Sequence, residues 1–328
     1  MSKQWRGVLA LAGWLALGAS GAMAFDLQGH RGARGLAPEN TLEGFATTLG
    51  IGVTTLELDI AITRDGVLTV HHDRRLIPDI ARGPDGKWIE AESEPIHAMT
   101  WAQLQTYDVG RLNPARNYAK RYPAQVPVDG ARVPRLADLF ALVKKSGNTA
   151  VKFAIETKLS PLAPDETPAP EAFAAMLVAE VRKASMEKRT QILSFDWRTL
   201  QAVQKIAPEI PTVYLSAQQR WLDNINAGGD SPWVAGFHHR LHGSVPRMIK
   251  AAGGTIWSVF MNDLTEALLA EARSLGLKVL VWTVNEPAAM ARFLDWKVDG
   301  IITDRPDLLR AEMAKRGMGL PAATRVTP

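Results

Sequence analysis

The sequence of 328 residues contains no cysteine. This absence excludes a disulfide framework, thiolate metal sites and cysteine nucleophiles. The chain also lacks any lysine- and arginine-rich block, and its formal net charge of +4 is too small to indicate nucleic-acid binding. The glycine fingerprint of a dinucleotide site is missing after the first predicted strand. We therefore expect a small-molecule partner.

Long apolar runs are also scarce, and the clearest one lies at the N-terminus. A basic start precedes an apolar stretch over residues 8–19, and the sequence AMA at residues 22–24 has the small-x-small pattern that signal peptidase cleaves. The stretch is shorter than the ~20 residues that a membrane span needs. The sequence thus predicts a signal peptide over residues 1–24, cleavage near Ala24, and a periplasmic or secreted protein without stable membrane insertion. An uncleaved N-terminal anchor is the alternative.

The rest of the chain alternates short β-branched or aliphatic runs with amphipathic stretches, which predicts a parallel sheet with right-handed crossovers. Eight such runs in about 300 residues favour an α/β fold of the TIM (β/α)8 barrel type over residues 25–316, rather than a doubly wound sheet. The predicted strands are residues 26–30, 53–60, 151–158, 191–195, 212–216, 254–259, 278–284 and 299–303.

Three segments interrupt this alternation. Residues 74–133, after the second strand region, are rich in proline, glycine, tryptophan and charge without clear periodicity, which is typical of a functional insertion or lid. Residues 233–246 form a second irregular stretch, and residues 317–328 read as a disordered tail. The first helix has a clear start signal, since Asn40 can cap it and Glu43 can complete a capping box.

Carboxylates occupy the inward-facing positions of two predicted strands. The strand period of two places Glu57 and Asp59 on one face, and it places Glu156 and Lys158 together on the next strand. Carboxylates inside a barrel are costly unless they are paired or bind a cation. Three of them make an oxygen-rich site for a hard divalent cation, Mg²⁺ or Ca²⁺. The alternative is a buried structural network with Lys158 or Arg31.

Histidine titrates near neutral pH and serves as a general acid or base. Of the seven histidines, His30 and His72 each lie where a short strand gives way to a loop, and charged residues flank both. The remaining ones give weaker signals. The spacing of His238, His239 and His242 matches no standard zinc pattern, so we expect loop residues there, and His97 has no supporting neighbours.

These motifs carry a family resemblance. GHRGARGLAPENT at residues 29–41, ELDIAITRDGVLTVHHD at residues 57–73 and IETK at residues 155–158 occur in this order. Together they resemble the glycerophosphodiester phosphodiesterase family. The resemblance implies a TIM-barrel hydrolase that cleaves glycerophosphodiesters to glycerol 3-phosphate and an alcohol with the help of a divalent cation.

The resemblance also implies roles for single residues. His30 and His72 would be the acid/base pair, with His72 preferred over its neighbour because it directly precedes Asp73. Arg31 and Lys158 would hold the phosphate. The implied metal ligands are Glu57, Asp59 and Glu156.

Aromatic side chains near the ends of late strands are candidates for a substrate wall. Phe195, Trp257 and Trp282 fall at such positions, where substrates of barrel enzymes bind. A core role is equally open for these aromatics. Asn285 and Asp304 are similarly placed, and core or loop roles remain open for them too.

Two other functions remain open from the sequence. The same site could act on lysophospholipids as a lysophospholipase D, which needs an apolar groove for the acyl chain. A non-catalytic exported phosphodiester-binding protein is disfavoured, because binding alone needs neither histidine. The sequence leaves the oligomeric state, the alcohol group and the choice between Mg²⁺ and Ca²⁺ open. It also leaves open which histidine is the acid and which the base, and whether water attacks directly or a cyclic phosphate forms first.

Overall fold

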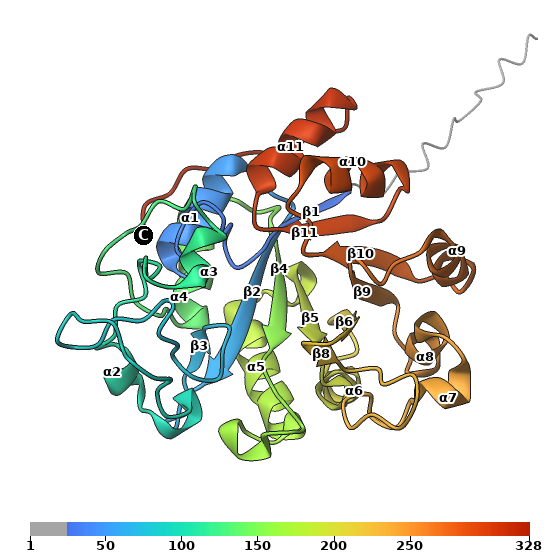
Figure 1. The fold of residues 1–328 in the computed structure, drawn as a ribbon, viewed down its shortest axis with the longest axis horizontal. Helices are drawn as coiled ribbons and strands as arrows, with labels where there is room; N and C mark the ends of the chain where they lie inside the picture. Colours follow the sequence, from blue (N-terminus) through green and yellow to red (C-terminus); the bar gives the residue numbers. More distant parts are fainter. Residues whose placement is uncertain (1–24) are drawn as a thin grey trace, which may run out of the picture.

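The computed structural model describes residues 25–328, so the predicted signal peptide lies outside the described residues. Within this part of the chain, no helix combines the length and apolar character that crossing a bilayer requires. Eight parallel strands close into a barrel, because β1 pairs with β2 on one side and with β11 on the other (Figure 1). The barrel strands are β1 (Asp26–Gly29), β2 (Thr55–Ile62), β4 (Lys152–Thr157), β5 (Thr190–Ser194), β6 (Thr212–Ser216), β9 (Ile256–Phe260), β10 (Lys278–Trp282) and β11 (Gly300–Thr303).

All eight predicted strands are present, and the TIM-barrel prediction is confirmed. A main helix lies between each barrel strand and the next, and one follows the last, as the alternating pattern predicts. These helices are α1 (Leu42–Ile51), α4 (Leu136–Lys145), α5 (Pro170–Ala184), α6 (Trp197–Ile206), α8 (Val245–Ala251), α9 (Glu266–Ser274), α10 (Pro287–Asp295) and α11 (Pro306–Lys315). Two short 3-10 turns, η2 (Pro164–Glu166) and η3 (Glu187–Arg189), flank α5.

Alternation along the strands separates two apolar layers. In β2, Leu56, Leu58 and Ile60 join the large core between barrel and helices, so Glu57 and Asp59 face the barrel interior. The apolar part of the interior is a smaller cluster contributed by β4, β5, β6, β9 and β10. The β2 side of the interior is therefore left to polar groups.

The insertion is an organised segment with its own small core. It follows β3 (Leu68–Val70), which pairs antiparallel with β2, and it contains η1 (Ile96–Ala98), α2 (Trp101–Leu104) and α3 (Asn117–Lys120). Its core is formed largely by Leu76, Ala81, Ile96, Met99, Leu104, Val109 and Val133. In Figure 1 the segment lies on the β2 and β3 side of the barrel, away from α8 and α9.

The second irregular stretch, residues 233–246, contains the short helix α7 (His239–His242) and is preceded by a short hairpin of β7 (Gln218–Gln219) and β8 (Leu222–Asp223). Beyond Arg316 the chain has no helix or strand, yet the Thr324 amide donates to the Leu49 carbonyl at 2.8 Å. Disorder of this tail stays a prediction.

Candidate active site

A cavity of about 830 Å³ opens at the carboxyl ends of the barrel strands, where barrel enzymes place their active sites. Eight predicted site residues line it, namely His30, Arg31, Glu57, His72, Glu156, Lys158, Phe195 and Trp282. The ninth, Asp59, is fully buried beside them. The strand period and the turn after β3 thus bring together all the predicted site residues.

The three carboxylates form one compact cluster inside the barrel. Glu57, Asp59 and Glu156 are buried, and each offers an oxygen within 4.8 Å of the others. Oδ2 of Asp59 accepts a hydrogen bond from the Asn40 side-chain amide at 2.9 Å, whereas Oδ1 has no hydrogen-bond partner among the described residues. The Lys158 ammonium lies 3.6 Å from that oxygen.

Electrostatics in this cluster favour an added cation. Burial, reinforced by Asp59 and Glu156, raises the pKa of Glu57 well above its ordinary value. Burial also raises the pKa of Glu156, and Lys158 offsets this only in part. Burial opposes the charge on Asp59 too, but His72, Lys158 and Arg31 hold its pKa below the ordinary value.

The pairing pattern bears on whether the cluster could hold a metal ion or forms a purely structural network. Lys158 Nζ lies 2.6 Å from Glu156, and Arg31 Nε lies 3.5 Å from Asp59. Glu57 has no lysine or arginine side chain within 4 Å in residues 25–328, and its close partner is the Arg31 backbone amide at 2.8 Å. Oxygen-only donors, an unpartnered oxygen and uncompensated charge together fit a hard divalent cation.

His30 directly follows β1, and its ring is held from one side. Its Nδ1 lies 2.6 Å from Asp304 Oδ1, and its Nε2 lies 3.9 Å from Glu57. Burial and the nearby Arg34 charge lower the pKa of His30 to about 4, although Asp304 opposes this shift. Arg34 and His30 hold the pKa of Asp304 well below its ordinary value despite burial. Because Asp304 is ionised and accepts the Nδ1 proton, Nε2 of His30 carries a free lone pair toward the cavity.

His72 follows β3 and also lines the cavity. Its Nδ1 lies 3.0 Å from Asp73 Oδ1, and its side chain stays partly exposed. Burial, Arg31 and Lys158 lower the pKa of His72 well below its ordinary value. The adjacent His71 is buried outside the cavity lining. The placement agrees with the choice of His72 over His71.

The opening motif positions Arg31 through strained backbone and side-chain contacts. Arg31 has a φ of 49°, in the left-handed region that non-glycine residues rarely adopt, and its Nη1 donates to Glu39 Oε1 at 2.8 Å. Asn40, which directly follows Glu39, also has a positive φ, of 54°. Thr41 is the N-cap of α1, where its Oγ1 accepts from the Gly44 amide. The prediction that Asn40 caps the helix is therefore wrong, because its backbone turns the amide inward to Asp59.

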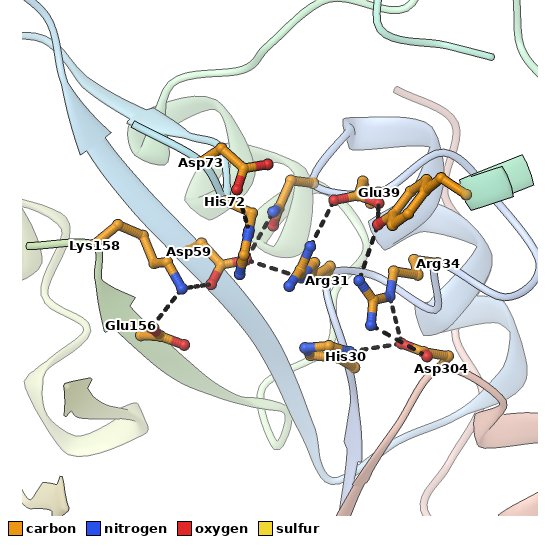
Figure 2. A network of polar contacts seen from close by, with 12 residues as sticks. His30, Arg31, Arg34, Glu39, Asp59, His72, Asp73, Glu156, Lys158 and Asp304 are labelled. Atoms are coloured by element: carbon orange, nitrogen blue, oxygen red, sulfur yellow. Dashed lines mark hydrogen bonds and ion pairs between the residues drawn. The ribbon is translucent and has the colours of Figure 1, made fainter. Parts of the chain in front are cut away.

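Sequence reasoning missed several polar residues around the site. Asp304 contacts His30 and accepts from Arg34 Nε at 2.8 Å (Figure 2). It also accepts from Asn285 Nδ2 at 2.7 Å. The positions of Asp304 and Asn285 after late strands were the available signal, although it left their roles open. Nothing in the sequence distinguishes Arg34, Glu39 and Tyr118 from other polar residues.

An aromatic wall faces the charged residues across the cavity. Phe195 and Trp282 pack edge to face with ring centroids 5.4 Å apart, and Phe260 and Trp221 extend the group. Trp257 is buried outside the cavity lining and donates to Ser216 Oγ at 2.8 Å, which gives it a core role.

The three late histidines lie apart from the site. His238 precedes α7, which begins at His239 and ends at His242, and none of the three lines the cavity. The Nδ1 of His238 accepts a hydrogen bond from the Ser231 amide at 3.2 Å.

A closed parallel barrel with imidazoles and carboxylates at the carboxyl ends of its strands is the architecture of a (β/α)8-barrel enzyme. Residues 30–308 match the Glycerophosphoryl diester phosphodiesterase family, and the chain belongs to this family. Membership confirms the resemblance carried by the motifs, and it confirms the prediction that the chain is an enzyme of the phosphoric diester hydrolase class.

Named relatives and solved structures cover most of the chain. A glycerophosphodiester phosphodiesterase of Bacillus subtilis (strain 168) is 27% identical over 288 residues, which cover 85% of this chain and 83% of the relative. A solved structure from Silicibacter pomeroyi DSS-3, described under the same family name, is 38% identical with a TM-score of 0.80, covering 91% of this chain and 96% of that one.

A more distant structure has a bound product. An Oleispira antarctica phosphodiesterase in complex with the product sn-glycerol-3-phosphate has a TM-score of 0.63 to this chain, at 18% identity. The match covers 88% of this chain and 96% of that one. At this identity, the likeness shows the common barrel fold.

Proposed function

We propose that this protein is a metal-dependent glycerophosphodiesterase that releases glycerol 3-phosphate and an alcohol by acid/base catalysis with His30 and His72. The observation that carries the proposal is the cavity itself, in which two imidazoles flank a cluster of three carboxylates beside Arg31 and Lys158. Family membership and the product-bound neighbour support the same substrate class.

The carboxylates are the candidate metal ligands. Glu57, Asp59 and Glu156 would hold Mg²⁺ or Ca²⁺, which when bound supplies positive charge to the non-bridging phosphate oxygens. Lys158 and Arg31 line the same cavity and would bind the phosphate directly.

We assign the two histidines different roles. His30 is the base, because Asp304 fixes its Nδ1 proton and leaves Nε2 free to accept the proton of the attacking hydroxyl. His72 is the acid, which protonates the departing alkoxide. Asp59 raises the pKa of His72 against burial, Arg31 and Lys158, and the negative charge of a bound phosphodiester would favour the imidazolium form further. Phe195 and Trp282 would contact the less polar part of the substrate.

The direct test is a coupled assay for glycerol 3-phosphate. We expect release from glycerophosphocholine and glycerophosphoethanolamine, loss of activity with EDTA, and recovery with Mg²⁺ or Ca²⁺. A lysophosphatidylcholine arm measures the competing lysophospholipase D activity. Recovery of all diesters unchanged after long incubation with metal would contradict hydrolysis and favour a binding protein.

We also propose that residues 1–24 direct export and are removed near Ala24. The basic start, the short apolar stretch and the AMA site support this proposal. N-terminal sequencing of protein from the periplasm or medium tests it, with Phe25 expected as the first residue. Retention of Met1 on membrane-associated protein would instead indicate an uncleaved anchor.

A further inference from the structure

One residue of the long insertion, Tyr118, lines the candidate active site and makes hydrogen bonds there through its hydroxyl. Tyr118 lies in α3, and its hydroxyl accepts a hydrogen bond from Arg34 Nη1 at 2.9 Å and donates one to Glu39 Oε2 at 2.5 Å. One acceptor and one donor use the hydrogen-bonding groups of a phenol well. Burial and the Glu39 charge raise the pKa of Tyr118 well above its ordinary value, so the hydroxyl stays protonated.

The first contact of Tyr118 leads to the proposed base. Arg34 donates two hydrogen bonds to Asp304, from Nε at 2.8 Å and from Nη2 at 3.4 Å. The same Asp304 oxygen that accepts from Nε lies 2.6 Å from His30 Nδ1. Figure 2 shows Arg34 and His30 approaching Asp304 together. The orientation of the His30 ring therefore depends on a carboxylate that Arg34 holds in place.

The second contact leads to the proposed phosphate-binding arginine. The other oxygen of Glu39, Oε1, accepts from Arg31 Nη1 at 2.8 Å. The backbone amide of Arg31 donates in turn to Glu57, one of the candidate metal ligands. The carboxylate of Glu39 thus links Tyr118 to Arg31 through its two oxygens, and Figure 2 shows its contact with Arg31.

We infer that Tyr118 is a positioning residue, through which the insertion fixes the orientation of His30 and Arg31 at once. The inference rests on the proposed function of those two residues. All its steps are hydrogen bonds between charged or buried groups, which are stronger and more directional than contacts on the surface. The insertion is therefore part of the catalytic apparatus as well as a wall of the cavity.

The neighbouring Tyr122 provides a matched control. Its ring lies 5.2 Å from that of Tyr118, and Arg34 Cζ lies over it at 4.9 Å from the centroid. Its hydroxyl has no hydrogen-bond partner within residues 25–328, and the residue does not line the cavity. Tyr122→Phe keeps the stacking on Arg34, so only Tyr118→Phe breaks the connection.

The kinetic experiment compares Tyr118→Phe, Tyr122→Phe and the wild type with saturating metal. Losing a hydrogen bond to charged groups predicts a fall in kcat of about tenfold or more for Tyr118→Phe, larger than its change in KM. Tyr122→Phe is expected to stay within about twofold of the wild type. Melting temperatures within about 5 °C of one another would show that the variants are folded. A wild-type kcat for Tyr118→Phe overturns the inference.

A double-mutant cycle tests whether the effect passes through Arg34. Arg34→Lys keeps the charge but removes the guanidinium fork that joins Asp304 to Tyr118. If Tyr118 acts through this fork, Tyr118→Phe costs much less kcat in the Arg34→Lys background than alone. Full additivity of the two substitutions contradicts the route through Arg34.

A spectroscopic readout separates this inference from the proposed function. The short bond between His30 Nδ1 and Asp304 should give a downfield proton resonance in the metal-free protein, assigned by its loss in His30→Ala. We expect Tyr118→Phe to shift or broaden it and Tyr122→Phe to leave it unchanged. An unchanged resonance in Tyr118→Phe refutes the positioning role. An inactive wild type would refute only the proposed function, since this resonance needs no turnover.

Discussion

The two sides of the cavity are built in different ways. On the side of β1, β2, β4 and the insertion, charged and imidazole groups are fixed by several directional contacts. Arg31, for example, binds both Glu39 and Glu57, and Asp304 binds three side chains. On the side of β5, β9, β10 and the β7–β8 hairpin, the aromatic side chains are held mainly by edge-to-face packing.

Under the proposed function, this difference would separate chemistry from recognition. Directional contacts fix the atoms of reacting groups to within a fraction of an ångström, which acid/base and electrostatic catalysis requires. Ring packing leaves a surface that tolerates ligands of different shape. Substitutions on the charged side should therefore change kcat, whereas those on the aromatic side should change KM.

The largest effect is expected for the imidazoles. His30→Ala and His72→Ala should each lower kcat by roughly 100- to 10,000-fold, because each removes one proton-transfer group. His97→Ala is the matched control, since that ring lies outside the cavity and contacts only the Ile62 carbonyl in the hydrogen-bond pattern of the described chain. Full activity in either site variant would overturn the acid/base assignment.

Glu57→Gln should produce the next largest effect. It removes one of three clustered carboxylates, so the affinity for Mg²⁺ or Ca²⁺ should fall by at least about tenfold. Calorimetric titration of EDTA-treated protein measures this, with the exposed Glu209→Gln as control. Since burial and neighbouring charges raise the pKa of Glu57, wild-type binding should also strengthen as the pH rises. Equal affinities in the two variants would indicate a structural network.

Much of the charged side could be predicted from the sequence because its signals are local. Glu57, Asp59, Glu156 and Lys158 follow the strand period of two, and that period needs no knowledge of the rest of the chain. Most of the barrel strands could also be predicted locally, since they are short β-branched or aliphatic runs, although β1 (DLQG) contains only one such residue.

The contacts that orient these groups could not be predicted in this way. Asp304 meets His30 only because β11 pairs with β1 when the barrel closes. Tyr118 meets Arg34 only through the path of an insertion without periodicity. Asn40 carried a cap signal in the sequence, but a positive φ redirected it to Asp59.

A smaller effect is expected on the free energy of unfolding, and its pH dependence should distinguish the charged side of the cavity from the aromatic side. Asp304→Asn should lower the free energy of unfolding by about 1.5–3 kcal/mol at neutral pH, because it weakens charged hydrogen bonds. The folded pKa of Asp304 lies below its unfolded value, so its stabilisation is present above about pH 4 and is lost as the pH falls further. Urea unfolding of the metal-free proteins should therefore show the difference shrinking in acid.

The control for this pH dependence comes from the aromatic side. Phe260→Leu removes a ring that packs on Trp221 and Trp282 and carries no titrating group. The loss in the free energy of unfolding that Phe260→Leu causes should be the same at neutral pH and in acid. A cost for Asp304→Asn that stays constant with pH would mean that this carboxylate is not ionised in the folded protein.

The smallest effect is expected on the aromatic side, with Trp282→Leu. An aromatic contact contributes about 0.5–1.5 kcal/mol beyond its area, so KM for glycerophosphodiesters should rise about two- to tenfold. The value of kcat should change less, because the charged side keeps its contacts. Steady-state kinetics measure both constants, with Trp296→Leu outside the cavity as control. A loss of kcat comparable to that of His30→Ala would show that the aromatic wall takes part in the chemistry, and the division between the two sides would fail.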